Sequence, residues 1–596
     1  MRQVIATAGH VDHGKSTLIR TLTGIEPDRL VEEKQRGLTI DLGFAWTTLP
    51  SGREVSFVDV PGHERFLGNM LAGLGPAPIV CFVIAADEGW RTQSSDHRDA
   101  IAALGIDQGL IVITRADLAP DRVEQVLAEA RSELSGTGLA SAPALGVSAV
   151  TGQGLDELRT LLDDTVGAAR EPVVDGRVRL WVDRAFSISG AGTVVTGTLA
   201  AGTLRREDHL TLCGAGRGGE VVVRGLQSRG GQLSQLGPVS RAAVNLRGVS
   251  TEEIGRGDAL LTPDAWALTQ HLDVRRSTGT PLDEAPQQLL AHIGTAAVGV
   301  RVRPLGPDHA RLALDRPLPL QLGDRLVLRS SGTHSVRNGV QVLDLDPPTL
   351  GRRGDGARRR TVLEQMPLGG DVAVEVRRRG AARASLLLRY GISMPDPLPE
   401  TVHRHGDWLV DTEVLTGWAE HLGRLIAQQR RDDPLAAGLP RKAAIDALAL
   451  PDEALLDAVV AAAGLIQHEG RVRDAESGRD LGAAEAGVRE LEERLARTPF
   501  AAPEADDLSA LGLGPRELAA AAAQGRLLRL PDEVILLPSA PALAMRALAA
   551  LPQPFTTSEA RQALGTTRRV AIPLLEHLDG RGWTRRTDPG HREVVR

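Results

Sequence analysis

The first 170 or so residues alternate between short apolar runs and stretches of helical periodicity. Residues 4–8, 55–58, 79–85 and 110–113 are each long enough for one buried strand. After the first run, Leu18, Ile19 and Leu22 recur at helical spacing. Alternating buried strands and amphipathic helices predict a doubly wound parallel α/β sheet for residues 1–172.

The pattern then changes twice. From about residue 178, short alternating strands with glycine turns predict two β-barrel domains, at residues 173–264 and 265–350. A linker rich in glycine and arginine follows at 351–360, and beyond it alanine- and leucine-rich helices recur with a loose period of about 60 residues. Each period ends in a glycine and two short strands, the plan of a winged helix. We therefore expect an α+β tail of tandem winged-helix domains at 355–411, 412–484, 485–540 and 541–596.

Composition excludes several classes of protein. A chain of 596 residues is too long for one core. Its net charge of −7 excludes a polycation, so any nucleic-acid site must be a local patch. Two cysteines exclude a disulfide framework or a zinc ligand set, and no apolar run is long enough to cross a bilayer. With no signal-peptide pattern at the N-terminus, we expect a cytoplasmic protein.

Residues 9–16 read Gly-His-Val-Asp-His-Gly-Lys-Ser between the first predicted strand and helix. This is the spacing of a phosphate-binding P-loop, in which backbone N–H groups, a lysine and a hydroxyl meet the phosphates and Mg²⁺. Lys15 is one of only three lysines in the chain, which supports a chemical role. The predicted phosphate contacts are Gly9, His10, Val11, Asp12, His13, Gly14, Lys15, Ser16 and Thr17.

A second group of residues predicts a nucleotide-dependent switch. Thr39, between the loop and the next motif, can join Ser16 at Mg²⁺ only while a γ-phosphate is present. Asp59 ends the second apolar run, where ligands bind in open α/β sheets, and is the third predicted Mg²⁺ ligand. Gly62 can offer its N–H to the γ-phosphate, and His63 is the predicted catalytic residue that orients the attacking water.

The end of the fourth apolar run predicts the base that is bound. Asp117, in Thr114-Arg115-Ala116-Asp117, can accept from guanine N1–H and N2–H₂, whereas an adenine edge would leave its carboxylate facing an acceptor. Thr114, Arg115, Ser148 and Ala149 complete the predicted guanine-binding set. The predicted ligands are therefore GTP or GDP with Mg²⁺, bound to an α/β P-loop GTPase domain.

Taken together, these motifs resemble those of translational GTPases. Within that superfamily, the sequences RGLTIDLGF and DVPGHERF resemble the selenocysteine-specific elongation factor (SelB) family. The resemblance covers residues 1 to about 350 and implies ribosome-stimulated GTP hydrolysis and two β-barrels after the GTPase domain. Two departures stand out: Arg115 occupies the place of the usual lysine of the guanine motif, and residues 337–339 differ from the expected small glycine-containing sequence. Arg115 can still cover the base as a flat cation, although arginine and lysine are not interchangeable at stacked sites.

A selenocysteine carrier must bind a selenolate and reject the seryl precursor. An anion in a half-buried pocket needs cationic donors. The candidates are Asp183, Arg184, Arg241 and Arg247 in the predicted second domain, with Phe44 as a wall from the first. The position that resembles that of Arg241 holds an asparagine in the ordinary aminoacyl-tRNA carrier. The alternative, that these are solvated barrel arginines, stays open.

The last tail unit carries a candidate RNA site. Thr556 or Thr557 is the candidate N-cap of one helix, with Glu559 as the partner acid. At the start of the next helix, backbone N–H groups and arginines converge into an anion site. This unit resembles the RNA-binding unit with which the family grips an mRNA hairpin, and the candidate contacts are Thr566, Thr567, Arg568, Arg569, Arg585 and Arg586. For the preceding units we favour a role as spacers or protein contacts.

The resemblance implies an elongation factor that delivers selenocysteyl-tRNA to the ribosome at UGA codons marked by an mRNA hairpin. Its expected partners are selenocysteyl-tRNA, the mRNA selenocysteine-insertion hairpin and the ribosome, with no membrane, and we expect a monomer. One alternative is another translational GTPase, initiation-factor-like or a general aminoacyl-tRNA carrier. Another is a winged-helix nucleic-acid regulator that uses GTP only as a switch.

Overall fold

The structure is a computed structural model that describes residues 2–27, 39–190, 192–214, 218–330, 332, 335–433, 436, 438–475 and 481–595. Residues 36–38 of the RGLTID motif lie outside the described residues. The chain divides into two compact units, residues 1–399 and 400–596, each described here by itself. In the described part of the chain, no helix combines the length and the apolar character that a membrane span requires.

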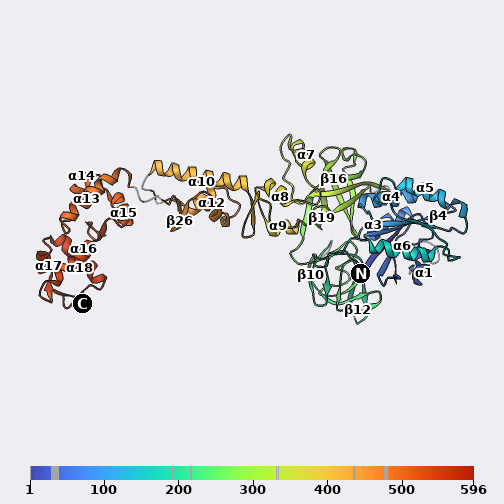
Figure 1. The fold of residues 1–596 in the computed structure, drawn as a ribbon, viewed down its shortest axis with the longest axis horizontal. Coiled ribbons are helices and arrows are strands. Elements are labelled where there is room, and N and C mark those ends of the chain that lie inside the picture. The colour runs from blue at the N-terminus through green and yellow to red at the C-terminus, as the bar shows by residue number, and fades with distance from the viewer. Residues whose placement is uncertain are drawn as a thin grey trace. The chain divides into compact units, whose positions relative to one another are not determined.

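The N-terminal domain is a six-stranded sheet with helices on both faces (Figure 1, blue). The strand order is β2-β3-β1-β4-β5-β6, parallel except for the edge strand β2. The strands are β1 (Arg2–Ala8), β2 (Gly43–Thr48), β3 (Glu54–Asp59), β4 (Ile79–Ala85), β5 (Gly109–Thr114) and β6 (Ala144–Gly146). The helices are α1 (Lys15–Thr23), η1 (Glu64–Phe66), α3 (Leu67–Leu74), α4 (Thr92–Leu104), η2 (Pro120–Arg122), α5 (Val123–Leu134) and α6 (Leu155–Gly167).

Period-two alternation places the helices of this domain on opposite faces of the sheet. On β1, Val4 packs in the core that contains α3, α4 and α5, whereas Ile5 packs in the core that contains α1 and α6. Because both faces are covered, the central strands are apolar throughout and every residue of β4 is buried. The predicted doubly wound α/β domain is confirmed.

The first barrel follows directly. Its sheet has the order β10-β15-β7-β8-β14-β11-β12, and an additional pairing of β10 with β11 closes it. A glycine-rich, alternating sequence suits such short, strongly bent strands. The strands are β7 (Arg179–Ile188), β8 (Gly192–Leu199), β9 (Leu204–Arg205), β10 (His209–Cys213), β11 (Gly219–Ser228), β12 (Gly231–Leu233), β13 (Gln235–Leu236), β14 (Ser240–Arg247) and β15 (Ala259–Leu261).

The second barrel is closed, with the strand order β16-β19-β18-β17-β20-β21. Its elements are β16 (Ala267–Gly279), η3 (Leu282–Glu284), β17 (Gln288–Ile293), β18 (Ala296–Pro304), β19 (His309–Leu320), β20 (Arg325–Arg329) and β21 (Val336–Asp344). Gly339 packs against α4, where an added Cβ would lie 2.6 Å from the Ala103 Cα. The unexpected sequence at 337–339 therefore forms part of the contact between this barrel and the α/β domain.

The beginning of the tail packs on the second barrel within the first unit. Its elements are α7 (Asp355–Gln365), α8 (Val372–Arg379), β22 (Ala381–Arg383) and α9 (Ala384–Arg389). Arg359 of α7 donates to Asp273 at 2.7 Å and to Asp344 at 2.5 Å, and all three side chains are buried. A buried ion cluster thus joins the helices to the barrel.

The second unit repeats helices followed by short antiparallel strands (Figure 1, orange to red). Its first half contains β23 (Val402–His405), β24 (Trp408–Asp411), α10 (Thr412–Asp432), β25 (Leu439–Pro440), α11 (Arg441–Leu448), η4 (Glu453–Leu455), α12 (Leu456–Ala462), β26 (Ile466–His468) and β27 (Arg471–Arg473). Its second half contains η5 (Gly482–Ala484), α13 (Glu485–Arg497), α14 (Ala505–Ala510), α15 (Pro515–Ala523), β28 (Leu528–Leu530), β29 (Val534–Leu536), α16 (Ala540–Ala549), β30 (Phe555–Thr556), α17 (Thr557–Ala563), α18 (Arg568–Gly580), β31 (Thr584–Arg586) and β32 (His591–Val594).

The last three helices and the sheet β30-β32-β31 form a winged helix. Thr556 is the N-cap of α17: its hydroxyl accepts from the Glu559 N–H at 3.2 Å, and the Glu559 carboxylate accepts from the Thr556 N–H at 2.6 Å. This reciprocal capping box confirms the predicted helix start.

Candidate functional site

The loop between β1 and α1 encloses Lys15. Gly14 ends the loop in the left-handed region, and Gly9 has φ +129° with space for no side chain, since a Cβ would lie 2.1 Å from the Val83 carbonyl oxygen. The buried Lys15 Nζ donates to the Gly9 and His10 carbonyls at 3.0 and 2.7 Å. The backbone carbonyls of the predicted phosphate loop therefore hold the Lys15 ammonium group in place.

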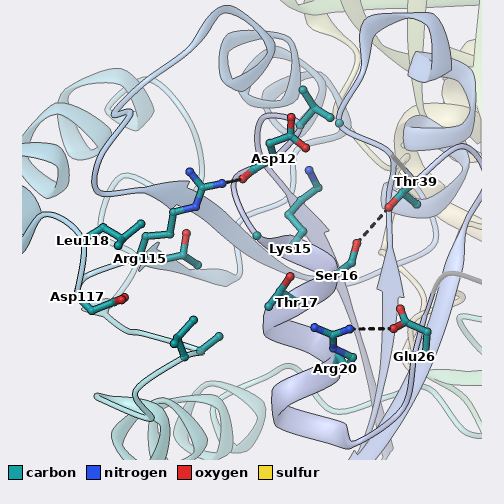
Figure 2. Close-up of a pocket in the computed structure, with 16 residues that line it drawn as sticks. Asp12, Lys15, Ser16, Thr17, Arg20, Glu26, Thr39, Arg115, Asp117 and Leu118 are labelled. Carbon is teal, nitrogen blue, oxygen red and sulfur yellow. Dashed lines mark hydrogen bonds and ion pairs between the residues drawn. The ribbon is translucent and has the colours of Figure 1, made fainter. Parts of the chain in front are cut away.

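The three predicted Mg²⁺ ligands lie together at one end of this loop. The Ser16 hydroxyl donates to Asp59 Oδ2 at 2.6 Å and lies 3.1 Å from the Thr39 hydroxyl, toward which it points in Figure 2. Asp59 is fully buried, and its other oxygen accepts from the Thr7 hydroxyl at 2.7 Å. Hydroxyl and carboxylate oxygens are the hard ligands that Mg²⁺ prefers, so this set fits the ion.

A cavity of about 870 Å³ opens over the loop (Figure 2). It is lined by Val11, Asp12, Gly14, Lys15, Ser16, Thr17, Arg20, Glu26, Thr39, Gly62, Thr114, Arg115, Asp117, Leu118, Ala149 and Val150. Predicted phosphate, metal and base residues from distant parts of the sequence therefore share one cavity. Gly62 comes so close that a Cβ would lie 2.5 Å from the Val11 nitrogen and 2.7 Å from Lys15 Nζ, which explains the glycine.

At the base end, Arg115 bonds to protein groups. Its guanidinium donates to Asp87 at 3.0 Å, to Glu88 at 2.9 Å and to the Asp12 carbonyl oxygen, the last of which Figure 2 draws. Thr114 donates from its hydroxyl to the His13 carbonyl oxygen at 2.7 Å. These bonds connect the guanine motif to the phosphate loop. Arg115 therefore holds protein groups together, in addition to any contact that it makes with the base.

Ser148 shapes the other wall of the base end. Its buried hydroxyl accepts from the Val150 and Thr151 N–H groups at 3.2 and 3.1 Å. This turn presents Ala149 and Val150 to the cavity that Asp117 also lines. Ser148 itself is absent from the lining, so its predicted role in guanine binding is indirect in this structure.

His63 is not among the residues that line the cavity. Its Nδ1 accepts from the Arg65 N–H at 3.2 Å as the cap of η1, and its ring lies 6.0 Å from the Phe66 ring. The predicted catalytic group thus stands next to Gly62 in sequence but is bonded to its own chain. The bond to Arg65 uses Nδ1 and does not involve Nε2.

Two predicted phosphate contacts, His10 and His13, have side chains outside the cavity lining. The fully buried His13 ring lies 3.4 Å from the Val83 carbonyl oxygen, under the loop. Burial, with the neighbouring His10 and Lys15 charges as smaller causes, lowers the pKa of His13 to about 3. The His13 side chain is therefore not available to a phosphate.

Several residues of the site were not predicted. Arg20 and Glu26 line the cavity and bond to each other at 3.2 Å, and Leu118 and Val150 border its base end. Helical spacing could have identified Arg20, which stands one turn after Ser16 on α1. His97 of α4 accepts from the Gly9 N–H at 3.2 Å through a contact that no sequence motif signals.

Four of the five predicted aminoacyl residues form one cluster between the α/β domain and the first barrel. The Arg241 Cζ lies 4.0 Å and the Arg184 Cζ 5.1 Å from the centroid of the Phe44 ring. Arg241 also forms an ion pair with the buried Asp183. Arg247 stands apart: it is exposed at the end of β14 and its nearest carboxylate is Glu207 at 3.4 Å.

The predicted RNA contacts divide into two groups. Thr566 and Arg569 are engaged inside the tail, where Thr566 donates to the Phe500 carbonyl at 2.5 Å and Arg569 to the Ala502 carbonyl at 3.1 Å. The exposed Thr567 is the N-cap of α18, and the exposed Arg568 has no hydrogen-bond partner among the described residues. The wing residues Arg585 and Arg586 are exposed and pair with Glu593 and with Asp579 and Glu576.

Comparison with known proteins identifies three regions. Residues 2–168 match the family described as Elongation factor Tu GTP binding domain, and residues 269–349 match Selenocysteine-specific elongation factor, beta-barrel domain. Residues 546–592 match Elongation factor SelB, winged helix. These matches fall on the α/β domain, the second barrel and the last winged helix.

Two relatives that match more than half of the chain agree. The chain is 39% identical over 352 residues to the selenocysteine-specific elongation factor of Escherichia coli, a match that spans 59% of this chain and 56% of that protein. It is 34% identical over 468 residues to the corresponding factor of Desulfomicrobium baculatum, covering 74% of this chain and 73% of the relative.

A solved structure extends the similarity to the full length. The crystal structure of a bacterial selenocysteine-specific elongation factor, EF-Sec, superimposes with a TM-score of 0.72 at 26% identity and covers 100% of both chains. With a GTPase domain, two β-barrels and a winged-helix tail, the chain belongs to the family of selenocysteine-specific elongation factors.

Proposed function

We propose that this chain binds selenocysteyl-tRNA in its GTP form and delivers it to the ribosome at UGA codons that an mRNA hairpin marks. The observation that carries the proposal is the cluster of Arg184 and Arg241 over the Phe44 ring, with Asp183 beneath. This cluster lies where the α/β domain meets the first barrel.

The chemistry of the cluster suits an anionic side chain. Guanidinium groups bind anions through charge-assisted hydrogen bonds, about twice as strong as those between neutral groups. A selenolate is an anion near neutral pH, whereas the hydroxyl of the seryl precursor is neutral. Two half-buried arginines therefore favour selenocysteine over serine, because they form charge-assisted hydrogen bonds with a selenolate and only weaker ones with a neutral hydroxyl.

In the nucleotide site, we assign guanine recognition to Asp117 and phosphate binding to Lys15 and the loop backbone. Ser16, Thr39 and Asp59 would hold Mg²⁺, which when bound neutralises developing phosphate charge. His63 orients the attacking water. Hydrolysis releases Thr39, and the tRNA is then released.

In the tail, we assign the mRNA hairpin to the exposed start of α18 and the wing. Thr567 and Arg568 offer backbone N–H groups and a guanidinium without a described partner, and Arg585 and Arg586 lie exposed on the wing. RNA hairpins are recognised through phosphates, shape and loop bases. Holding the hairpin raises the local concentration of the factor at the codon.

Filter binding with three cargoes tests the proposal. The full chain, loaded with a non-hydrolysable GTP analogue, is titrated with selenocysteyl-tRNA, the same tRNA carrying serine, and an ordinary aminoacyl-tRNA. We expect tight binding of the first alone. Tight binding of the ordinary aminoacyl-tRNA would indicate a general carrier, and no tRNA binding at all would indicate a GTP-switched nucleic-acid regulator.

A further inference from the structure

One short segment, residues 39–42, joins the metal site to the aminoacyl cluster. At its start, the Thr39 hydroxyl lies 3.1 Å from that of Ser16. Two residues later, Asp41 accepts from Arg184 Nε at 3.0 Å and pairs with Nη2 at 2.8 Å. The Leu42 carbonyl accepts a further bond from the same guanidinium.

The two arginines of the cluster are held differently. Arg241 bonds to Asp183 and to the Thr198 hydroxyl, which belong to the same barrel. Arg184 takes its carboxylate partner, Asp41, from the other domain. The first arginine is therefore a fixed part of the barrel, whereas the position of the second depends on the segment that carries Thr39.

The middle of this segment is also held by contacts with α3 and with the first barrel. Asn69 of α3 donates to the Ile40 carbonyl at 2.8 Å, and Arg256 of the first barrel donates to Asn69 at 2.8 Å and lies 3.6 Å from Asp41. Two residues of extended chain span at most about 7 Å. A displacement of Thr39 by more than this span would therefore pull on Asp41 and on its ion pair with Arg184.

We propose that Asp41 is a positioning residue that orients the Arg184 guanidinium for an anionic aminoacyl side chain only while Thr39 lies at the metal ligands. Arg184 Nη1 has no hydrogen-bond partner among the described residues, and it is the donor left for the anion. This inference rests on the proposed function of the cluster. Through the Asp41–Arg184 ion pair, the bound nucleotide would control how strongly the protein prefers selenocysteine to serine.

The test measures tRNA affinity of the full chain and of Asp41→Ala and Asp41→Asn. Each protein is titrated with selenocysteyl-tRNA and with the same tRNA carrying serine, once with a non-hydrolysable GTP analogue and once with GDP. We expect Asp41→Ala to weaken selenocysteyl-tRNA binding about tenfold in the triphosphate form only. Seryl-tRNA binding should not change, and Asp41→Asn, which keeps an acceptor oxygen, should retain most of the affinity.

Glu54→Ala is the matched control. Glu54 pairs with Arg229 of the same barrel at 2.5 Å, and its side chain is 36% exposed against 30% for Asp41. It bridges the same two domains but lies outside the 39–42 segment. We expect this variant to keep wild-type selectivity in both nucleotide states.

Four results would overturn the inference: an equal loss for both aminoacyl groups, an equal loss in both nucleotide states, tighter selenocysteyl-tRNA binding by Asp41→Ala, or no change in that binding. The first two indicate general support of the interface, and the third indicates that Asp41 competes with the anion. If the wild-type chain does not prefer selenocysteyl-tRNA, the proposed function itself fails. If it does and Asp41→Ala is unchanged, only this inference fails.

Discussion

At the scale of single residues, Arg115 stands where the guanine motif usually has a lysine, and it forms several hydrogen bonds within the protein. Its guanidinium reaches Asp87, Glu88 and the Asp12 carbonyl, a combination that the single ammonium of a lysine does not reproduce. The residue also has φ +53°, in the left-handed region that non-glycine residues rarely adopt. Arg115 therefore connects the base end of the nucleotide pocket to the phosphate loop by hydrogen bonds.

We expect Arg115→Ala to weaken GDP binding about tenfold, since it removes charge-assisted bonds to the phosphate loop. Titration with a fluorescent GDP derivative measures this, with Arg159→Ala, an exposed residue of α6 paired with Asp156, as the control. The GDP affinity of Arg115→Lys should lie between that of the wild type and that of Arg115→Ala. An unchanged GDP affinity of Arg115→Ala would show that the hydrogen bonds of Arg115 do not contribute to nucleotide binding.

His97 supports the loop from behind. Burial, with the positive charge of Lys15 next in importance, holds the pKa of His97 well below its usual range, so the ring is neutral and its Nδ1 can accept from the Gly9 N–H. Removing this acceptor leaves a buried N–H unpaired, at a cost of about 1–3 kcal/mol.

His97→Ala should therefore raise the GDP dissociation constant about tenfold, whereas His97→Asn, whose Oδ1 can take the place of Nδ1, should stay near wild type. The same fluorescent titration measures both. Equal losses in the two variants would mean that the size of the ring, and not its acceptor nitrogen, supports the loop.

At the scale of elements, the join between α7 and the second barrel rests on buried charge. Arg359 is 5% exposed and lies between Asp273 and Asp344, of which the first also pairs with Arg311. Without Arg359, Asp273 keeps Arg311 and Asp344 keeps Arg378, so the cost should lie at the low end of the about 3–5 kcal/mol for breaking a buried ion pair.

Arg359→Ala should lower the free energy of unfolding of the first unit by about 3 kcal/mol, measured by urea titration. Arg358→Ala, one position away on the exposed face and paired only with Asp355 among the described residues, should change it by less than about 0.5 kcal/mol. Similar effects of the two variants would refute the role of the buried cluster.

The start of α18 is the element that we assign to RNA. Arg568→Ala should weaken binding of the mRNA hairpin and reduce the salt dependence of the affinity by about one unit of slope, because one phosphate contact is lost. Arg489→Ala on α13, exposed and paired with Glu485, is the control. A hairpin affinity that Arg568→Ala leaves unchanged would place the RNA elsewhere on the tail.

At the scale of the whole molecule, sequence patterns were sufficient for the order and type of the domains. Strand and helix periods predicted the α/β domain and the barrels, and motif spacing brought Ser16, Thr39 and Asp59 to one point. Periodicity could not separate Arg241 from Arg247, since both stand on the same face of β14, as its second and eighth residues. Six residues of strand separate them by about 20 Å, and only the first reaches Phe44.

Contacts between segments far apart in sequence were beyond prediction. His97 meets Gly9 across 88 positions, and Asp41 meets Arg184 across 143. No local pattern encodes such pairs, because they depend on how domains pack. In the tail, the same reason explains why Thr566 and Arg569, predicted at an RNA surface, instead bond to residues 500–503.

The central claim is that the Phe44 cluster recognises the charge of the aminoacyl side chain. The most direct measurement compares selenocysteyl-tRNA and the same tRNA carrying serine on wild type and Arg184→Ala, with a non-hydrolysable GTP analogue bound. The account predicts that the variant loses about ten- to a hundredfold in affinity for the selenocysteyl form and little for the seryl form. Affinities that fall equally for both would contradict it.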